Sequence, residues 1–245
     1  MSREFDNERE HGKKLAASDP ELIWGWGTPA GKVRAARRAA LIAQGAGLEP
    51  GVHALEIGCG TGLFTEIFAD TGAFVTAVDI SAELLEAARG KGLDPERVRF
   101  IEKPFEECEV DGPFDAVIGS SILHHLDLRR SFSKIFDLLK PGGVACFAEP
   151  NMLNPQILVQ KNVPWIKKAL GDSPDETAFV RWTLAAFLEG KGFVEVDIRP
   201  FDWLHPLTPE GLVLGVSRLG KILEEIPGVR EFAGSLLIRC RRPSR

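Results

Sequence analysis

The sequence lacks the usual features of secreted, zinc-binding and membrane-spanning proteins. Its four cysteines, Cys59, Cys108, Cys146 and Cys240, are far apart and form no C-x-x-C pair, which argues against a disulfide framework and a metal site. No apolar run approaches the roughly 18 residues of a transmembrane helix. The first 14 residues are charged throughout, unlike a secretory signal, so we expect a cytoplasmic protein.

A concentration of positive charge is also missing. The formal net charge is −5, and the basic residues are scattered along the chain. Proteins that bind nucleic acids usually carry a basic stripe, so no nucleic-acid partner is expected. Apolar residues, in contrast, are plentiful: they make up 44% of the 245 residues, which is enough for one large domain with a buried core.

Short apolar segments alternate with amphipathic ones along most of the chain. The expected strands are 52–57, 74–80, 98–102, 114–120, 144–149, 194–200 and 235–242. Continuous apolar strands that alternate with helices are typical of a doubly wound α/β fold, in which helices cover both faces of a mostly parallel sheet. A ligand then lies outside the carboxyl ends of the strands, where the strand order reverses.

Capping and breaking residues mark the expected helix ends. Thr28 is a typical N-cap, and Gly45 and Gly47 are expected to end the helix that Thr28 opens. Ser81 caps the helix after the second strand. The helix before the fifth strand is expected to stop at Pro141, and a late helix is expected to begin at a cap formed by Thr208 and the proline after it.

No linker or repeat divides the chain, so residues 1–245 are interpreted as one domain with two additions. Residues 1–47 are an N-terminal arm followed by a lid helix. Residues 151–192 are too long for one crossover helix and are interpreted as a helical insertion after the fifth strand, whose last helix opens at a capping-box pattern over 173–176. Both additions are candidates for a lid over a ligand.

A glycine-rich loop follows the first expected strand. Its glycines are Gly58, Gly60 and Gly62. Glycine allows positive φ and lets a ligand lie against the backbone, and the next helix offers free N–H groups to a carboxylate or a phosphate. Asp79 ends the second strand, where an acid can accept two hydrogen bonds from ribose hydroxyls. Glu56 stands just before the loop, where a carboxylate would repel a pyrophosphate but would favour a ligand with an ammonium group.

Four segments occur in a characteristic order, and they are ALEIGCGTGLFT, VTAVDIS, FDAVIGSSILHHL and LLKPGGVACFAEP. Together they resemble the class I S-adenosylmethionine-dependent methyltransferases, most of all the small-molecule branch that includes ubiquinone- and menaquinone-type enzymes. The resemblance covers about residues 50–150. It implies a Rossmann-like methyltransferase fold with seven strands, of which the last is antiparallel.

The resemblance implies S-adenosylmethionine as cofactor, with S-adenosylhomocysteine as its product. It assigns to the methionine half of the cofactor Glu56, Gly58, Cys59, Gly60 and Gly62. It assigns Asp79 to the ribose, Ile80 and Phe105 to the adenine, and Ser120 to the neighbourhood of the reactive methyl group or the methionine tail. The expected reaction is methyl transfer to an oxygen, nitrogen or carbon of a small organic molecule, in EC class 2.1.1.

Three side chains are candidates for catalysis at the ends of the fourth and fifth strands. A base must remove a proton when a hydroxyl or amine is methylated, and His124 or His125 can serve, with His124 preferred. Glu149 can accept a proton or orient an amine. Alternatively, both histidines are packing residues in an enzyme that works by proximity alone, and Glu149 caps the turn that follows it.

The sequence leaves several alternatives open. Its five tryptophans can wall an aromatic or lipid-like substrate, or they can anchor the additional helices. A protein methyltransferase and a non-catalytic adenosyl-binding regulator are alternative functions. An NAD-dependent oxidoreductase is disfavoured because Leu63 stands where the dinucleotide pattern needs its last glycine. Neither the substrate nor the oligomeric state follows from the sequence.

Overall fold

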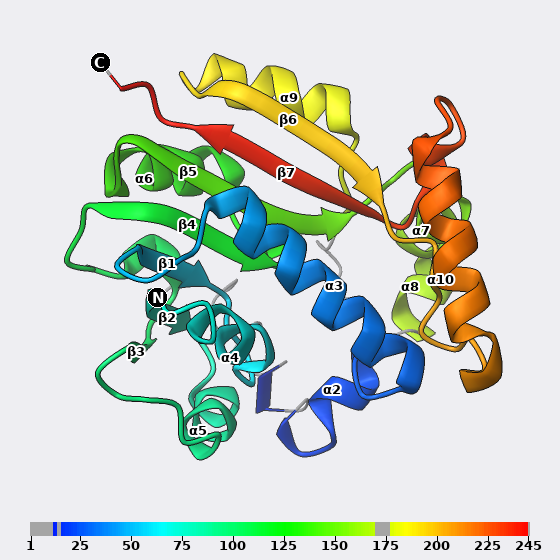
Figure 1. Ribbon diagram of the computed structural model, residues 1–245, viewed down its shortest axis with the longest axis horizontal. Helices are drawn as coiled ribbons and strands as arrows, with labels where there is room; N and C mark the ends of the chain where they lie inside the picture. Colours follow the sequence, from blue (N-terminus) through cyan, green and yellow to red (C-terminus); the bar gives the residue numbers. More distant parts are fainter. Residues whose placement is uncertain (1–11, 14–15, 170–176, 245) are drawn as a thin grey trace.

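The chain folds around a twisted, mostly parallel sheet (Figure 1). The computed structural model describes residues 12–13, 16–169 and 177–244. Within them the strands are β1 (His53–Ile57), β2 (Phe74–Asp79), β3 (Val98–Glu102), β4 (Phe114–Ser120), β5 (Leu139–Pro150), β6 (Val194–Phe201) and β7 (Ser235–Arg241). Their order is β3-β2-β1-β4-β5-β7-β6, and β7 runs antiparallel to both of its neighbours. The predicted fold class is confirmed.

Helices cover both faces of this sheet (Figure 1). The described α-helices are α2 (Pro20–Ile23), α3 (Pro29–Ala46), α4 (Leu63–Ala69), α5 (Ala82–Gly90), α6 (Leu128–Leu138), α7 (Pro155–Asn162), α8 (Pro164–Ala169), α9 (Arg181–Gly190) and α10 (Glu210–Glu225). Three short 3-10 turns are η1 (Phe105–Glu107), η2 (Leu123–His125) and η3 (Arg230–Phe232). No helix in the described ranges is both long and apolar enough to cross a membrane.

Two apolar cores lie on opposite faces of the sheet because successive side chains of a strand point to opposite sides. Ala54 of β1 packs in the core under α3 and α4, whereas its neighbour Leu55 packs in the core under α6 and α9. Small residues on the first face let α3 approach the sheet closely. A Cβ on Gly45 would lie 2.8 Å from Cys146 Sγ, so Gly45 serves helix–sheet packing inside α3 and does not end it. Gly47, with a left-handed φ of +67°, is the C-cap of α3, as predicted.

The structure confirms two of the predicted caps and corrects two helix boundaries. Thr28 Oγ1 accepts the N–H of Gly31 at 2.9 Å, and Ser81 caps α5 in the same way. Pro141 does not stop a helix, because α6 already ends at Leu138 and β5 begins at Leu139. Helix α10 begins at Glu210, and no side chain caps it.

The region after β5 contains three described helices with different surroundings. Helix α9 packs on β6, and its Leu184 and Leu188 belong to the core. Helices α7 and α8 pack on each other. The predicted cap at 173–176 lies outside the described residues, and α9 begins at Arg181, where no side-chain cap is present.

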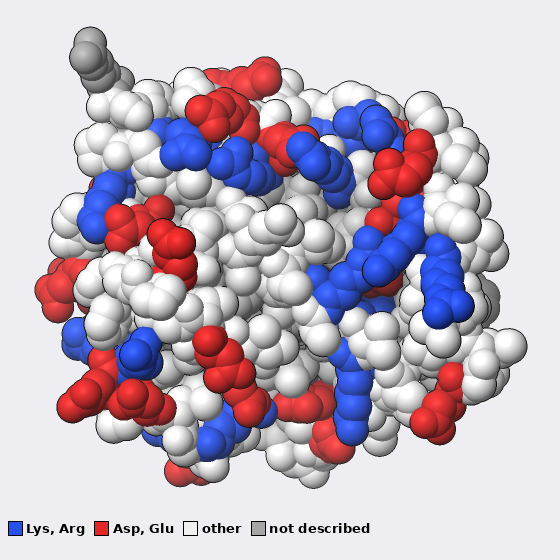
Figure 2. All heavy atoms as spheres, in the orientation of Figure 1, with Lys and Arg blue, Asp and Glu red and all other residues white. Residues whose placement is uncertain are grey.

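The strand order reverses between β1 and β4, which are neighbours in the sheet. The loop after β1 and the turn after β4 therefore leave the same edge of the sheet in opposite directions, as expected for a ligand site in an α/β fold. Acidic and basic side chains are interspersed over the face of the molecule shown in Figure 2.

Candidate functional site

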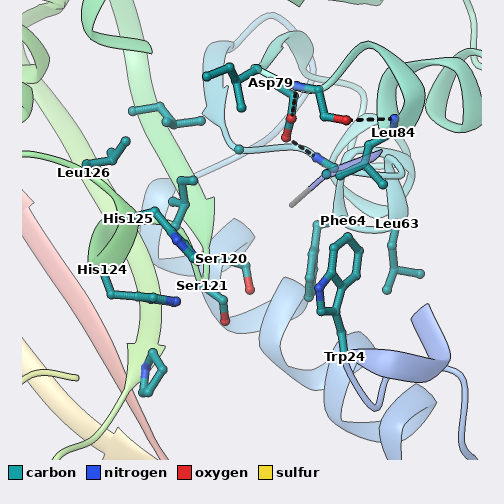
Figure 3. A pocket seen from close by; sticks show the side chains of 18 of the residues that line it. Trp24, Leu63, Phe64, Asp79, Leu84, Ser120, Ser121, His124, His125 and Leu126 are labelled. Carbon is teal, nitrogen blue, oxygen red and sulfur yellow. Dashed lines mark hydrogen bonds between the residues drawn. The ribbon is translucent and has the colours of Figure 1, made fainter. Parts of the chain in front are cut away.

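A cavity of about 550 Å³ opens at this edge of the sheet. Its walls come from the glycine loop, the ends of β2 and β4, η1, η2, α3, α7 and the segment before α3 (Figure 3). Eight of the residues predicted from the sequence line it, namely Gly58, Gly60, Asp79, Ile80, Phe105, Ser120, His124 and His125. The other four, Glu56, Cys59, Gly62 and Glu149, do not line it.

The glycine loop depends on its glycines for both backbone conformation and space. Gly58 and Gly60 have φ values of +68° and +52°, which side chains with a Cβ rarely adopt. A Cβ on Gly58 would lie 2.5 Å from Ile122 Cδ1, and one on Gly60 would lie 3.3 Å from a ring carbon of Trp24. The loop therefore forms a bare cradle between β1 and α4, on the floor of the cavity.

Asp79 joins the end of β2 to the glycine loop. Its Oδ2 accepts the N–H of Gly60 at 2.7 Å, and its Oδ1 accepts the N–H of Ser81 at 2.9 Å (Figure 3). Burial raises the pKa of Asp79, while these backbone hydrogen bonds act in the opposite direction. A carboxylate has about four acceptor positions, so each oxygen can still accept a hydrogen bond from a ligand.

Glu56 lies behind the loop, on the side of the sheet that α4 covers. Only 1% of it is exposed, and its Oε2 accepts the hydroxyl of Thr65 at 2.6 Å. Burial raises the pKa of Glu56 from 4.5 to about 8. The side chain is thus hydrogen-bonded to α4, and it is protonated at neutral pH unless a nearby cation ionises it.

Glu149 organises the turn after β4 from the end of β5. Its Oε1 accepts the N–H groups of Ile122 and Leu123, both at 2.8 Å. Its Oε2 lies 2.6 Å from Nδ1 of His124. The fully buried Glu149 therefore caps η2 and orients the histidine, whereas Asn151 and Asn154 supply the side-chain hydrogen bonds in the turn after β5.

His124 is held as a base would be. Because the Glu149 carboxylate accepts at Nδ1, the imidazole carries its proton there, which makes Nε2 the acceptor nitrogen of a side chain that lines the cavity. The ring of His125 lies 4.3 Å from that of His124, centroid to centroid, and both labelled histidines approach the cavity in Figure 3. The two adjacent side chains thus both reach the cavity.

A buried arginine from α3 closes the wall between the ends of β4 and β5. Arg38 is only 2% exposed and donates to Ser121 Oγ at 3.0 Å and to the carbonyl of Ala148 at 3.0 Å. It also donates to Ser235 Oγ. Burial lowers the pKa of Arg38 to about 10, so the group stays charged at neutral pH. Its Nε is buried and has no hydrogen-bond partner among the described residues.

The segment before α3 covers the glycine loop. Trp24 packs on Gly60, and Glu21 accepts the hydroxyl of Thr61 at 3.1 Å. Trp26 packs edge-on against Phe64 of α4, with 5.6 Å between ring centroids. This segment forms one wall of the cavity (Figure 3), and α7 contributes to another through Ile157.

The five tryptophans have three kinds of surroundings. Trp24 and Trp26 line the cavity, Trp203 packs beside Gly220 of α10, and Trp165 and Trp182 are 73% and 53% exposed.

In the described ranges, no group of three or more His, Cys, Asp and Glu side chains could hold a metal ion.

Sequence reasoning missed Arg34 and Arg38, which line the cavity from α3. Their spacing of four residues places them on one face of a helix, and this was the signal that could have identified them. Both guanidinium groups lie close to the Trp26 ring, at 5.1 and 5.3 Å from its centroid. Arg34 is also paired with Asp202 at 2.8 Å. The cavity thus has a cationic and aromatic lining contributed by α3 and the segment before it.

Comparison with known proteins gives a consistent result. Residues 55–147 match the family model of a methyltransferase domain. Over 99 residues the chain is 38% identical to the ubiquinone biosynthesis O-methyltransferase of Xylella fastidiosa, and this alignment covers 38% of this chain and 39% of that protein. Over 153 residues it is 31% identical to the protein of the same name from Coxiella burnetii, and this alignment covers 59% of this chain and 65% of that protein. The chain thus matches only part of each relative.

A solved structure extends the likeness of the fold to nearly the whole chain. The N-methyltransferase NodS from Bradyrhizobium japonicum, in complex with S-adenosylhomocysteine, superposes with a TM-score of 0.63 at 17% sequence identity. The superposition covers 96% of this chain and 98% of NodS.

Proposed function

We propose that this protein transfers a methyl group from S-adenosylmethionine to an oxygen, nitrogen or carbon of a small organic molecule, because residues 55–147 match the family model of a methyltransferase domain and the chain shares the fold of a solved N-methyltransferase. The observation that carries the proposal is the cavity itself. It joins a bare glycine loop with an acid at one end to a glutamate-oriented histidine at the other.

The side chains present fit the cofactor. The cradle at Gly58 and Gly60 has no room for a Cβ, so a ligand can lie directly on the backbone. Asp79 is placed to hold the ribose hydroxyls, with Ile80 and Phe105 beside the adenine. Arg38 offers a buried positive charge and an unused Nε donor to the methionine carboxylate.

The catalytic contribution of the chain is proton removal and positioning. When bound, the cofactor supplies a methyl group on a sulfonium, ready for in-line attack by a nucleophile. Nε2 of His124 accepts the proton of a substrate hydroxyl or amine, and Glu149 holds the imidazole in the correct tautomer and stabilises its charged form. Alignment of two reactants in such a cavity contributes roughly 7–11 kcal/mol.

The two additions to the core serve as the lid in this proposal. The contact of Trp24 with Gly60 supports this role for the N-terminal part, and the lining residue Ile157 supports it for α7. A deep concave cavity suits a small-molecule substrate better than a protein side chain presented on a surface. The four cysteines are free and buried, which supports activity in the reducing cytoplasm.

Calorimetric titration with S-adenosylmethionine and S-adenosylhomocysteine tests the cofactor assignment directly. We expect micromolar dissociation constants for both, and the absence of heat from either would contradict the proposal. A screen of small metabolites with a methyl-labelled donor then identifies the acceptor. Transfer of label to the protein substrates of a cell extract, but to no small molecule, would overturn the substrate class and leave the cofactor assignment intact.

A further inference from the structure

The inner face of helix α10 packs against the rest of the chain. It runs along the edge of the molecule (Figure 1) and packs on α3, β6 and η3. Val213 and Gly220 are its buried residues, and a Cβ on Gly220 would lie 3.0 Å from Cβ of Trp203. Glu224 binds Arg37 of α3 at 2.8 Å and accepts the N–H of Asp202 at 2.9 Å. Contacts within the chain thus account for this side of the helix.

The outer face of α10 carries an apolar stripe that nothing in the described chain covers. Leu212, Leu219 and Ile222 are 58%, 54% and 60% exposed, and Ile226, the residue that follows the helix, is 41% exposed. The spacing of seven and three residues places Leu212, Leu219 and Ile222 on one side of the helix. A surface helix of a monomer normally presents polar residues there, so this face has the composition of an interface.

Two glycines lie in or beside this stripe without an internal reason. A Cβ on Gly211 or Gly215 would meet no atom within 4 Å, in contrast to one on Gly220. Each glycine inside a helix costs about 1 kcal/mol relative to alanine. A gap at Gly215 between Leu212 and Leu219 lets a second backbone approach closely. The gap therefore points to an occupant from outside the described residues.

We propose that this occupant is α10 of a second copy of the chain, packed antiparallel about a two-fold axis. The residues 212, 215, 219 and 222 are separated by three, four and three positions, so the pattern reads the same from either end. In the antiparallel pair, Leu219 fills the gap at Gly215 of the second copy, and Leu212 meets Ile222. An isologous interface requires this kind of self-complementarity.

The size and chemistry of the stripe agree with a helix–helix partner. Side chains of this size and exposure remove on the order of 1,000 Å² from water in a pair of copies, which is at the lower limit for stable interfaces. Helices that lie on membranes are rich in Lys and Arg on the polar face and carry Trp or Phe on the other. The stripe on α10 has no aromatic residue, and its exposed flank mixes Arg218 and Lys221 with Glu225.

Sedimentation equilibrium of the full chain at roughly 1–100 µM tests the interface, because it gives the dissociation constant of the dimer for each variant. We expect a dimer that Leu219→Glu converts to a monomer by weakening association at least about 100-fold. Leu214→Glu is the matched control, because Leu214 is 63% exposed on the same helix but lies outside the stripe. Both variants should melt at the temperature of the unmodified chain.

Cysteine cross-linking tests the antiparallel arrangement. The native cysteines of the described chain are buried, so an introduced surface thiol is the reactive one. A mixture of Leu212→Cys and Ile222→Cys chains should form mixed disulfides under mild oxidation, and either variant alone should form few. A monomer at the highest concentration, equal effects of Leu214→Glu and Leu219→Glu, or a monomer that sediments with anionic lipid vesicles would each overturn the proposal.

Discussion

Two carboxylates at the same edge of the sheet, one half-buried and one fully buried, use their hydrogen bonds differently. Asp79 is the last residue of β2 and Glu149 is the second-last residue of β5, and each accepts two backbone N–H groups. Asp79 uses one oxygen for each and fixes the loop on which we propose the cofactor lies. Glu149 uses a single oxygen for both, which leaves the other for His124. In our proposal, this difference in the use of the two oxygens separates Asp79, which binds the cofactor, from Glu149, which orients the base.

Replacement of His124 should have the largest effect at the Glu149 end. His124→Gln removes the acceptor that takes the substrate proton, so kcat should fall by about 10²–10⁴-fold, the usual contribution of a general base. The dissociation constant of S-adenosylhomocysteine, measured by calorimetry, should stay within a factor of a few. His125→Gln is the control. A kcat that stays within tenfold would show that the reaction proceeds by proximity alone.

Glu149→Gln should act through the histidine and have a somewhat smaller effect. The amide oxygen can still accept the N–H groups of Ile122 and Leu123, but the amide N–H₂ donates to Nδ1 and forces the proton of His124 onto Nε2. We expect kcat to fall by roughly 10²-fold and the pH dependence of kcat to change, since a base is no longer preformed. An unchanged pH profile would mean that Glu149 only caps η2.

Asp79→Asn should separate the two ends, because it affects binding and leaves the base in place. An amide accepts at one atom only, so either Gly60 or Ser81 loses its acceptor, and the ribose loses one as well. The affinity for S-adenosylhomocysteine should weaken by roughly 10–100-fold, or about 1.4–2.8 kcal/mol. Glu102→Gln at the exposed end of the neighbouring strand is the control. If Asp79→Asn lowered kcat at saturating cofactor instead, the division of roles would be wrong.

Glu56→Gln should have the smallest effect, on stability and its dependence on pH. The folded-state pKa of about 8 exceeds the ordinary value of 4.5, so protonated Glu56 stabilises the fold at low pH and this contribution is lost as pH rises through 8. The glutamine variant lacks this loss. Its free energy of unfolding, relative to that of the unmodified chain, should therefore rise by on the order of 1–3 kcal/mol between pH 6 and pH 9. Melting curves at both pH values measure it, with exposed Glu66→Gln as control. A constant difference between the two proteins would contradict the raised pKa.

The sequence was sufficient to predict the fold and the family resemblance, and both are confirmed. Strands such as 98–102 and 114–120 were predicted with their observed bounds, because continuous apolar runs between turn residues are local features. Helix ends were less predictable, since Gly45 looks like a terminator but serves a close contact with Cys146. The predicted residues that line the cavity follow strand ends, where topology alone brings them together.

The parts of the site that the sequence did not reveal depend on distant contacts. Arg38 binds groups that lie between 82 and 197 positions further along the chain. Glu149 reaches back 25 positions to His124, so its partner could not be inferred from its neighbours in the turn. Such pairings arise only when β4 and β5 are placed side by side. Local pattern therefore identifies the residues at the strand ends better than the side-chain contacts between them.

The indole of Trp24 resting on Gly60 has a practical consequence. Its fluorescence should respond whenever a molecule settles on the loop beneath it, because the polarity around the ring changes. Trp165 and Trp182 face the solvent and contribute a steady background. The chain thus carries an intrinsic optical probe of occupancy, and a Trp24→Phe variant supplies its blank.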